Sequence, residues 1–358
     1  LHTPLRSGTS VWFVTDLERL GDALQDVRPT LFFGVPRVWE KIAARIQAKG
    51  AEASGLRKKL IAWARRAGLD GGYAEQERRS KPWSFWLAER LVFRKVRERI
   101  GLDQAKLCVS SAAPISMETL EFFLSLGIPI DEVYGMSECT GPTTMSLPGV
   151  RRIGKAGMVA PGTELKTLDD GEILIRGPHV FLGYYKDDDA TRRVLDDEGW
   201  LHSGDVGEID SDGFLEITDR KKDLIITAGG HNISPQNIEK QLQGIEGVSQ
   251  AVVVGDRRSY LVALLTIDRE KLRSVAASVA SGAVDSDTAR KCPRLRAYLQ
   301  KKIDQVNETL ARSETIKKFH ILPNEFDIET GELTPTMKIR RRFVTEKYDD
   351  EIEQLYSS

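Results

Sequence analysis

The chain has 358 residues, of which 41% are hydrophobic and 29% charged, so it can bury a sizeable core and does not resemble a disordered chain. Its 52 Lys and Arg residues balance 53 Asp and Glu residues, and this near-neutral charge excludes a global basic field for nucleic acid. Its three cysteines form no CxxC pair and indicate neither a disulfide framework nor a thiolate metal site, as expected for a cytosolic protein.

The first hundred residues predict alternating strands and helices. A strand-like run at 10–14 precedes a helical pattern at 16–27 and an apolar strand at 29–36. Apolar residues then recur at helical spacing over 37–50 and 55–67. This order predicts an α/β layer.

A long amphipathic helix is predicted over residues 83–101, which alternate aromatic and basic side chains and end at Gly101. Two interpretations remain open for this segment. It is either a packed helix with a solvated basic face or a helix that docks on a membrane surface.

A strand–helix–strand unit follows, with a strand at 105–110, a helix at 117–127 and a strand at 128–135. Ligands of such sheets bind outside the carboxyl ends of the strands. The small-residue loops 110–116 and 134–141 leave from that edge, so we expect them to let a flat ring approach the backbone.

Between residues 150 and 220 the pattern changes to short strands with Gly and Asp turns. The alternation at 171–177 and the hairpin at 205–219, with its turn at 210–213, predict a small barrel or distorted sheet.

Beyond Asp219 the α/β pattern resumes. Ser234 and Pro235 suit the N-cap and N1 positions of a helix. The Ser- and Ala-rich stretch 278–291 is predicted to be a flexible loop. The remaining predicted elements are a strand into a glycine turn at 223–230, two strands within 248–268, helices at 269–280 and 293–312, a strand at 316–323 and a helix at 343–355.

These patterns divide the chain into three parts. We expect a partial large α/β domain at 1–149, a small β-barrel-like subdomain at 150–219, and a smaller mobile α+β domain at 220–358. The linker between the last two, 219–223, is charged and contains neither Gly nor Pro, unlike most passive linkers.

One polar loop carries residues suited to nucleotide chemistry. Tyr134 can stack on a base, Ser137 can donate to a phosphate oxygen, and Glu138 can hold Mg²⁺, which prefers oxygen ligands. The alternative is an ordinary polar loop.

Three further residues fit the same chemistry. Asp205 can accept hydrogen bonds from a ribose diol, Arg220 can bind ribose or phosphate oxygens, and Lys338 can neutralise the approach of a carboxylate to an α-phosphate. Each has a plainer alternative: a turn Asp bonded to its own backbone, a solvated charge run, and a surface lysine. The basic run at 338–342 leaves nucleic-acid binding as an outside alternative.

Together, these motifs resemble the acyl-adenylate-forming superfamily of acyl-CoA synthetases, adenylation domains and luciferases. The resemblance extends along nearly the whole chain, and the segments 27–42 and 333–338 resemble the long-chain fatty acyl-CoA synthetases, with the bubblegum-type branch as one candidate. The motifs are YGMSE (134–138), SGD (203–205), DRKKDLI (219–225), AGGHNISPQNIE (228–239) and LTPTMKIRR (333–341).

The resemblance implies an enzyme that joins a fatty acid to ATP with Mg²⁺, releases pyrophosphate, and passes the acyl group from acyl-AMP to CoA. Glu138 would ligate Mg²⁺, Asp205 and Arg220 would hold the ribose, and Lys338 would be the catalytic lysine. The remaining nucleotide-binding residues would be Ser111, Ala112, Ala113, Pro114, Tyr134, Gly135, Met136 and Ser137.

The resemblance further implies that the C-terminal domain rotates between the two half-reactions. Lys222 matches the hinge, and Gly229 and Gly230 would line the path of CoA. A few hinge residues can absorb such a backbone change.

One expected motif is missing. Members of the superfamily carry a Gly/Ser/Thr-rich phosphate loop ending in lysine before the region that matches 27–42, and RSGTS (6–10) is too short to match it. With Leu1 at its start, the chain is expected to be the C-terminal portion of a longer enzyme. Two alternatives stay open: a non-catalytic AMP-binding remnant, and a ligase that delivers the acyl group to a carrier protein.

Overall fold

The computed structural model describes residues 6–14, 16–113, 115–146, 149–334 and 337–357. Backbone contacts divide the chain into two compact units. The first unit combines Leu1–Ser137 with Gly141–Ala160, and the second combines Glu138–Thr140 with Pro161–Ser358.

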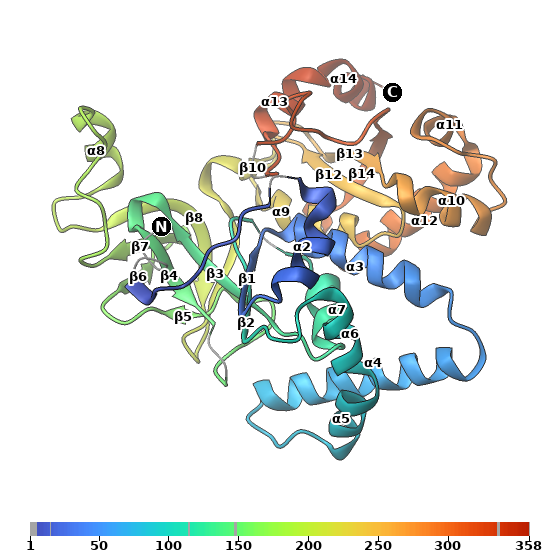
Figure 1. Cartoon of the computed structure of the whole chain (residues 1–358). Helices are drawn as coiled ribbons and strands as arrows, with labels where there is room; N and C mark the ends of the chain where they lie inside the picture. The colour runs from blue at the N-terminus through green and yellow to red at the C-terminus, as the bar shows by residue number, and fades with distance from the viewer. Residues whose placement is uncertain (1–5, 15, 114, 147–148, 335–336, 358) are drawn as a thin grey trace. The chain divides into compact units, whose positions relative to one another are not determined.

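A five-stranded sheet forms the centre of the first unit, in the order β1-β2-β3-β4-β5 (Figure 1). Pairing is parallel from β1 to β3 and antiparallel from β3 to β5. The carboxyl ends of β1, β2 and β3 therefore share one edge, as the predicted strand–helix–strand unit requires. The strands are β1 (Leu31–Gly34), β2 (Leu107–Ser110), β3 (Ile130–Met136), β4 (Gly141–Met145) and β5 (Met158–Val159).

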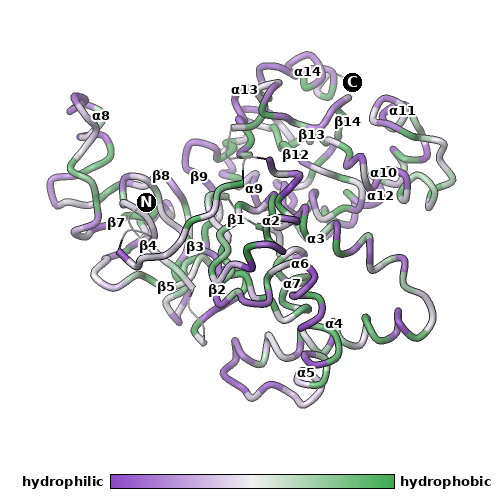
Figure 2. Tube along the Cα trace, viewed as in Figure 1, coloured by the Kyte–Doolittle hydropathy of each residue, from purple (hydrophilic) through white to green (hydrophobic). Residues whose placement is uncertain are grey.

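The helices of this unit pack on the sheet and on one another, and their chains carry both hydrophobic and hydrophilic residues (Figure 2). The helices are η1 (Leu17–Arg19), α2 (Leu20–Val27), α3 (Pro36–Ala51), α4 (Gly55–Gln76), α5 (Trp83–Ala88), η2 (Glu89–Phe93), α6 (Arg94–Ile100) and α7 (Met117–Leu124), with the short turn η3 (Ser137–Cys139).

Trp39 of α3 centres the core of this unit. Its ring is fully buried and meets Phe32 and Phe123 edge-on, with centroids 4.9 and 5.0 Å away. Its Nε1–H donates to the backbone oxygen of Val109 at 3.1 Å, so helix and sheet are joined by packing and by a hydrogen bond.

The predicted helix at 83–101 is confirmed as a helical stretch, with a π-helical turn, η2, between α5 and α6. Gly101 ends it in the left-handed region at φ 73°. An added Cβ there would lie 2.1 Å from the backbone oxygen of Leu24, so this helix stop is specific to glycine.

The second unit begins with an antiparallel sheet in the order β6-β7-β8-β9, the curled sheet predicted from the turn pattern. Its strands are β6 (Glu164–Thr167), β7 (Glu172–Arg176), β8 (Leu201–Ile209) and β9 (Leu215–Arg220), and helix α8 (Asp188–Val194) lies between β7 and β8 in the chain.

The rest of this unit contains a three-stranded sheet, β12-β13-β14, and a short ribbon, β10-β11. Both strands predicted within 248–268 and the strand at 316–323 are confirmed. The strands are β10 (Ile225–Ile226), β11 (Asn232–Ile233), β12 (Val248–Val254), β13 (Leu261–Ile267) and β14 (Ile316–Ile321). The helices are η4 (Lys221–Asp223), α9 (Pro235–Gln243), α10 (Arg269–Ser278), α11 (Ser286–Lys291), α12 (Pro293–Asn307), η5 (Arg312–Glu314), α13 (Arg341–Lys347) and α14 (Asp349–Ser357).

Three sequence predictions were wrong in detail. Residues 10–14 form no strand, and the strand predicted to lead into the glycine turn within 223–230 is only the short β10. The stretch 278–291 contains helix α11, because the Asp285 carboxylate accepts from the backbone N–H of Thr288 at 2.8 Å and forms a capping box.

The helices in the described part of the chain are all too short or too polar to cross a bilayer.

Candidate active site

The two small-residue loops predicted to meet do so in the first unit. Ser110 of β2 pairs with Glu132 of β3, and the Ser111 hydroxyl donates to the backbone oxygen of Val133 at 2.8 Å. Ala112 follows at φ 77° and is exposed, as is Ala113. Pro114 lies outside the described residues. The hydrogen bond thus ties the loop after β2 to the end of β3.

Tyr134 and Gly135 lie at a bulge between β3 and β4. Tyr134 is buried, with 7% of its surface exposed, and Met136 ends the strand. A Cβ at Gly135 would lie 2.0 Å from the backbone oxygen of Gly141, so the two strands approach where no side chain fits. This close approach of β3 and β4 determines how the backbone enters the polar loop that carries Ser137 and Glu138.

Gly135→Ala is therefore expected to lower the free energy of unfolding by about 1–3 kcal/mol, because the neighbouring backbone must shift to admit a methyl group. Denaturant unfolding checks this. Gly50→Ala is the matched control, since the structure places no atom within 4 Å of its added Cβ. Equal effects of the two substitutions would contradict the steric account.

Glu138 lies in η3, after the exposed Ser137, and belongs to the second unit. Its backbone oxygen accepts from the N–H of Phe181 at 2.7 Å, and its Oε1 accepts from the Tyr184 hydroxyl at 2.8 Å. The hydrogen bond to the carboxylate raises the pKa of Tyr184 above its ordinary value. The sequence did not lead us to Tyr184, although the aromatic residues clustered at 181–185 could have indicated a contact with the site.

The Glu138 carboxylate fits a magnesium ligand. A carboxylate has two oxygens with about four lone-pair sites, and Tyr184 binds only Oε1. Mg²⁺ is usually bound through one or two carboxylates together with substrate phosphates, so a single protein carboxylate is consistent with it. Within the described residues, no group of three or more His, Cys, Asp or Glu side chains is arranged to hold a metal alone.

Asp205 and Arg220 face each other across the β8–β9 pair. They are partners in the strand register, and Arg220 Nε lies 3.2 Å from Asp205 Oδ1. The Ser203 hydroxyl donates to the backbone oxygen of Ile173 at 2.7 Å and accepts from the N–H of Asp205 at 3.1 Å. The SGD motif thus fixes the backbone beneath a buried carboxylate.

Lys338 lies next to Ile339, which forms an isolated antiparallel bridge with Leu333. Its backbone N–H donates to the Thr334 hydroxyl at 3.0 Å, and its backbone oxygen accepts from the N–H of Thr334 at 2.8 Å. Met337 beside it has φ 61°, a left-handed value that is costly for a residue with a side chain. The conformation of Met337, directly before Lys338, is therefore closely constrained.

Within the second unit, Lys338 lies within electrostatic reach of Asp205 and Arg220, although it is distant from them in sequence. Burial lowers the pKa of the Lys338 ammonium, the Arg220 guanidinium lowers it further, and the Asp205 carboxylate opposes both. We call Asp205, Arg220 and Lys338 the charged cluster. It places two cations and one carboxylate together, the groups that a ribose and an α-phosphate require.

The predicted hinge residue, Lys222, lies in η4 with its side chain exposed. The neighbouring Lys221 forms ion pairs at 2.7 Å with Asp170 and 2.8 Å with Glu172, which hold this turn to the sheet β6–β9. Sequence reasoning treated Lys221 only as part of a charge run and missed this anchor.

The predicted glycine turn joins β10 to β11. Gly229 and Gly230 are both exposed, and Gly230 has φ 78° with no atom within 4 Å of an added Cβ. The turn is closed by a hydrogen bond from the N–H of Gly230 to the backbone oxygen of Thr227 at 2.8 Å. The backbone at Gly229 and Gly230 is therefore exposed and carries no side chains.

Asp219, immediately before the hinge, is fully buried. Its Oδ2 accepts from the Ser234 hydroxyl at 2.7 Å and from the N–H of Gln236 at 3.2 Å. Ser234 and Pro235 hold the predicted N-cap and N1 positions, but the Ser234 side chain makes no capping hydrogen bond. Asp219 caps α9 from another segment and ties the helix to the end of β9.

Two arginines of the basic run at 338–342 form ion pairs with glutamates. The Arg341 guanidinium donates to both carboxylate oxygens of Glu239 at 2.7 Å, and Arg342 Nε donates to Glu346 at 2.8 Å. The mostly buried pair of Arg341 with Glu239 takes up one of the cations that a nucleic-acid surface would need.

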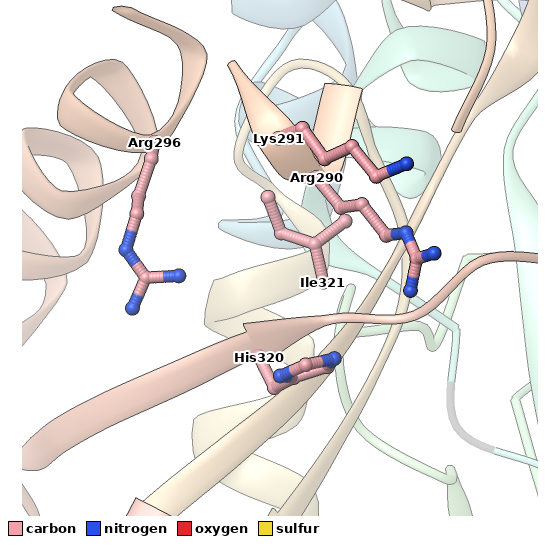
Figure 3. A pocket seen from close by; sticks show the side chains of 5 residues that line it. All are labelled: Arg290, Lys291, Arg296, His320 and Ile321. Carbon is pink, nitrogen blue, oxygen red and sulfur yellow. The ribbon is translucent and has the colours of Figure 1, made fainter. Parts of the chain in front are cut away.

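A separate cavity of about 280 Å³ opens near the end of β14 (Figure 3). Burial lowers the pKa of His320 in its wall, and two arginines add to this against the opposing charge of Glu351. Its described lining includes none of the residues predicted from the sequence. The lining residues are Arg290, Lys291, Arg296, His320 and Ile321.

Comparison with known proteins identifies relatives of the whole chain. The chain is 40% identical over 366 residues to the long-chain-fatty-acid–CoA ligase ACSBG2 of Xenopus laevis, covering 94% of this chain and 49% of the relative. It is 42% identical over 359 residues to the putative fatty-acid–CoA ligase fadD11 of Mycobacterium tuberculosis (strain CDC 1551 / Oshkosh), covering 98% and 62%. The chain thus spans roughly half to three-fifths of the length of these relatives.

Solved structures match the fold. The adenylation domain of the carboxylate reductase GR01_22995 from Mycobacterium chelonae has a TM-score of 0.70 at 23% identity, covering 96% of this chain and 49% of that one. ATP-bound MatB from Rhodopseudomonas palustris has a TM-score of 0.65 at 21% identity, covering 98% and 57%.

Two family descriptions match different parts of the chain. "AMP-binding enzyme" matches residues 1–185, and "AMP-binding enzyme C-terminal domain" matches residues 222–358. The chain belongs to the AMP-binding enzyme family.

Proposed function

We propose that this chain takes part in the ATP-dependent activation of a long-chain fatty acid, first to acyl-AMP and then to acyl-CoA. The observation that carries the proposal is the charged cluster, in which Lys338 lies close to Asp205 and Arg220. The names of the relatives, fatty-acid–CoA ligases at about 40% identity, support the substrate class.

In the first half-reaction, a carboxylate oxygen of the fatty acid attacks the α-phosphorus of ATP. A phosphorus–oxygen bond forms, the bond to the β-phosphate breaks, and pyrophosphate leaves. Two anions approach each other in this step, and the Lys338 ammonium stabilises the charge that accumulates between them. Asp205 would accept from the ribose hydroxyls, while Arg220 would donate to ribose oxygens.

In this proposal, residues of the first unit bind the adenine base. The ring of Tyr134 would lie against one face of the base, and the backbone of Ser111–Pro114 against the other. Gly135 and Met136 would continue this wall, and Ser137, exposed beyond β3, would donate to a phosphate oxygen. The Ser111–Val133 hydrogen bond supports the pairing of these two loops.

Glu138 would hold Mg²⁺ through its carboxylate, with Tyr184 fixing the side chain by its hydrogen bond to Oε1. When bound, the ion would supply positive charge to offset that of the leaving pyrophosphate.

In the second half-reaction, the CoA sulfur attacks the acyl carbonyl carbon and loses its proton to solvent. A carbon–sulfur bond forms, the bond from the carbonyl carbon to the phosphate oxygen breaks, and AMP leaves. We propose that residues 220–358 rotate about Lys222 between the steps, as a mobile domain distinct from 1–149 and 150–219. The turn at Gly229 and Gly230 would then line the pantetheine path. Its exposed, side-chain-free backbone supports this role, because a narrow thiol arm can pass close to it.

The proposal is tested by supplying the protein with ATP, Mg²⁺ and palmitate and measuring pyrophosphate, then adding CoA and measuring AMP. Palmitate-dependent pyrophosphate followed by CoA-dependent AMP supports the fatty acid–CoA ligase. Pyrophosphate without CoA-dependent AMP favours delivery to a carrier protein. A rise in melting temperature with AMP but no pyrophosphate favours a non-catalytic adenylate-binding protein.

The proposal also predicts the pH dependence of adenylation. Lys338 acts in its charged form, so the rate falls as pH rises through its lowered pKa. Arg220→Gln removes a repulsive cation, raises that pKa, and is expected to move the alkaline limb of kcat/KM to higher pH. Asp205→Asn removes the opposing carboxylate and is expected to move it lower. Normalised profiles from about pH 7 to 10 check this, and shifts in the reverse directions would contradict it.

A further inference from the structure

The buried carboxylate of Asp219 joins the two sides of the proposed hinge. Asp219 lies in β9, shortly before Lys222, and its side chain is shielded from solvent. From beyond the hinge, the Ser234 hydroxyl and the backbone N–H of Gln236 donate to its Oδ2, and Nε2 of Gln236 donates to its Oδ1 at 2.9 Å. We call these hydrogen bonds between Asp219, Ser234 and Gln236 the hinge-crossing contact.

The Asp219 carboxylate depends on the segment beyond the hinge for most of its partners. Its Oδ1 also accepts from the backbone N–H of Arg220 at 2.6 Å, so four donors meet about four lone-pair sites. Three of these four donors belong to Ser234 and Gln236. A buried carboxylate is costly unless hydrogen bonds satisfy it, so the loss of these three donors would be strongly unfavourable.

The helix that Asp219 caps also leads to the proposed catalytic lysine. Gln236 lies in the first turn of α9, and the buried Glu239 follows in the next turn. The Arg341 guanidinium donates to both carboxylate oxygens of Glu239. Arg341 begins α13, directly after the segment that carries Lys338. The position of Lys338 therefore depends on α9, and Asp219 holds the N-terminus of that helix.

We propose that Asp219 is a positioning residue that stabilises the arrangement for adenylation, in which Lys338 belongs to the charged cluster. This inference rests on the proposed function, because it assumes the rotation about Lys222. The rotation carries α9 away from β9, since β9 ends before the hinge and α9 follows it, so the hinge-crossing contact must open. Its strength then sets the ratio of the adenylation arrangement to the second arrangement.

Distances across the hinge test this without requiring any activity. Nitroxide labels on Ser211→Cys and Lys301→Cys lie at exposed positions before and after the hinge, and Cys292→Ser removes the partly exposed native thiol. Double electron–electron resonance then measures the populations of the two arrangements. Asp219→Asn is expected to raise the second arrangement relative to the first by about tenfold, because it weakens hydrogen bonds to a charged group. The same distance distribution in wild type and Asp219→Asn would overturn the inference.

The rates of the two half-reactions give a second measurement. When each rate is proportional to the population of its own arrangement, the ratio of the adenylation rate to the thioester-forming rate follows the population ratio. This rate ratio is therefore expected to fall by about tenfold in Asp219→Asn. A purely structural role of Asp219 would lower both rates together, and an unchanged rate ratio would contradict the inference.

Lys222→Pro distinguishes the hinge-crossing contact from a direct effect of Asp219→Asn on the neighbouring Arg220. Proline at the hinge already favours the adenylation arrangement. In that background, Asp219→Asn is expected to change the adenylation rate by no more than about twofold. A fall of several-fold in adenylation that persists with Lys222→Pro would overturn the inference.

Ser234→Ala tests the same contact from the other side of the hinge and keeps the test decisive if Asp219→Asn folds poorly. It removes one neutral donor and is expected to shift the population ratio and the rate ratio in the same direction by about threefold. The control is Asp285→Asn, because Asp285 caps α11 through Thr288 entirely beyond the hinge, and both ratios are expected to stay unchanged. Equal shifts in Ser234→Ala and Asp285→Asn would overturn the inference.

These results separate the role of Asp219 from the proposed function. Populations that shift in Asp219→Asn, without pyrophosphate release or CoA-dependent AMP, would support Asp219 as the residue that holds the observed arrangement and would contradict the ligase. Both half-reactions in wild type, with population and rate ratios that do not move in Asp219→Asn, would support the ligase and overturn the role of Asp219.

Discussion

Lys338→Ala is expected to lower the rate of adenylation by about 10²–10³-fold, while conversion of supplied acyl-AMP to acyl-CoA stays within about threefold of wild type. The ammonium neutralises charge only while the carboxylate approaches the α-phosphate, so its loss affects that step. Carboxylate-dependent exchange of pyrophosphate into ATP measures the first rate, and CoA-dependent release of AMP measures the second.

Lys301→Ala is the control for this prediction. Lys301 is an exposed lysine on α12, so its loss removes a positive charge without touching the charged cluster, and both rates are expected to stay unchanged. An equal fall of both rates in Lys338→Ala would show that the lysine supports the fold or the nucleotide in general, rather than the first step.

Lys222→Pro is expected to produce the opposite pattern, with adenylation near wild type and thioester formation lowered by about 10²-fold or more. Proline fixes φ near −65°, so the residue can no longer absorb the backbone change that rotation requires. Lys221 beside it would still hold the hinge to Asp170 and Glu172, which favours the arrangement seen in the structure.

Lys222→Ala distinguishes the effect of a rigid backbone at position 222 from the effect of losing the positive charge there. It removes the ammonium but leaves φ free, and both half-reactions are expected to proceed. If Lys222→Ala lowers thioester formation as much as Lys222→Pro, the side chain rather than the rotation is responsible.

The sequence was a good guide wherever an element buries one regular face. The strand–helix–strand unit ending at Met136 and the hairpin of β8 and β9 were predicted close to their observed bounds, because apolar periodicity and turn residues are local signals. The register of that hairpin then sets Asp205 opposite Arg220, a proximity that follows from two separate motifs.

The sequence was an incomplete guide where a partner from another segment decides the structure. Residues 10–14 have strand-like composition but form no strand, because a strand requires a hydrogen-bonded neighbour. Asp219 caps α9 from the end of β9, and Tyr184 binds Glu138 from a loop distant in sequence. The position of Lys338 beside the charged residues of β8 and β9 likewise depends on the fold of the whole second unit.

The most direct test of the two-step account is the ratio of the adenylation rate to the thioester-forming rate, measured in one preparation each of wild type, Lys338→Ala and Lys222→Pro. The account predicts that the ratio falls by about 10²-fold or more in Lys338→Ala and rises by a similar factor in Lys222→Pro. A ratio that stays at the wild-type value in both variants would contradict it.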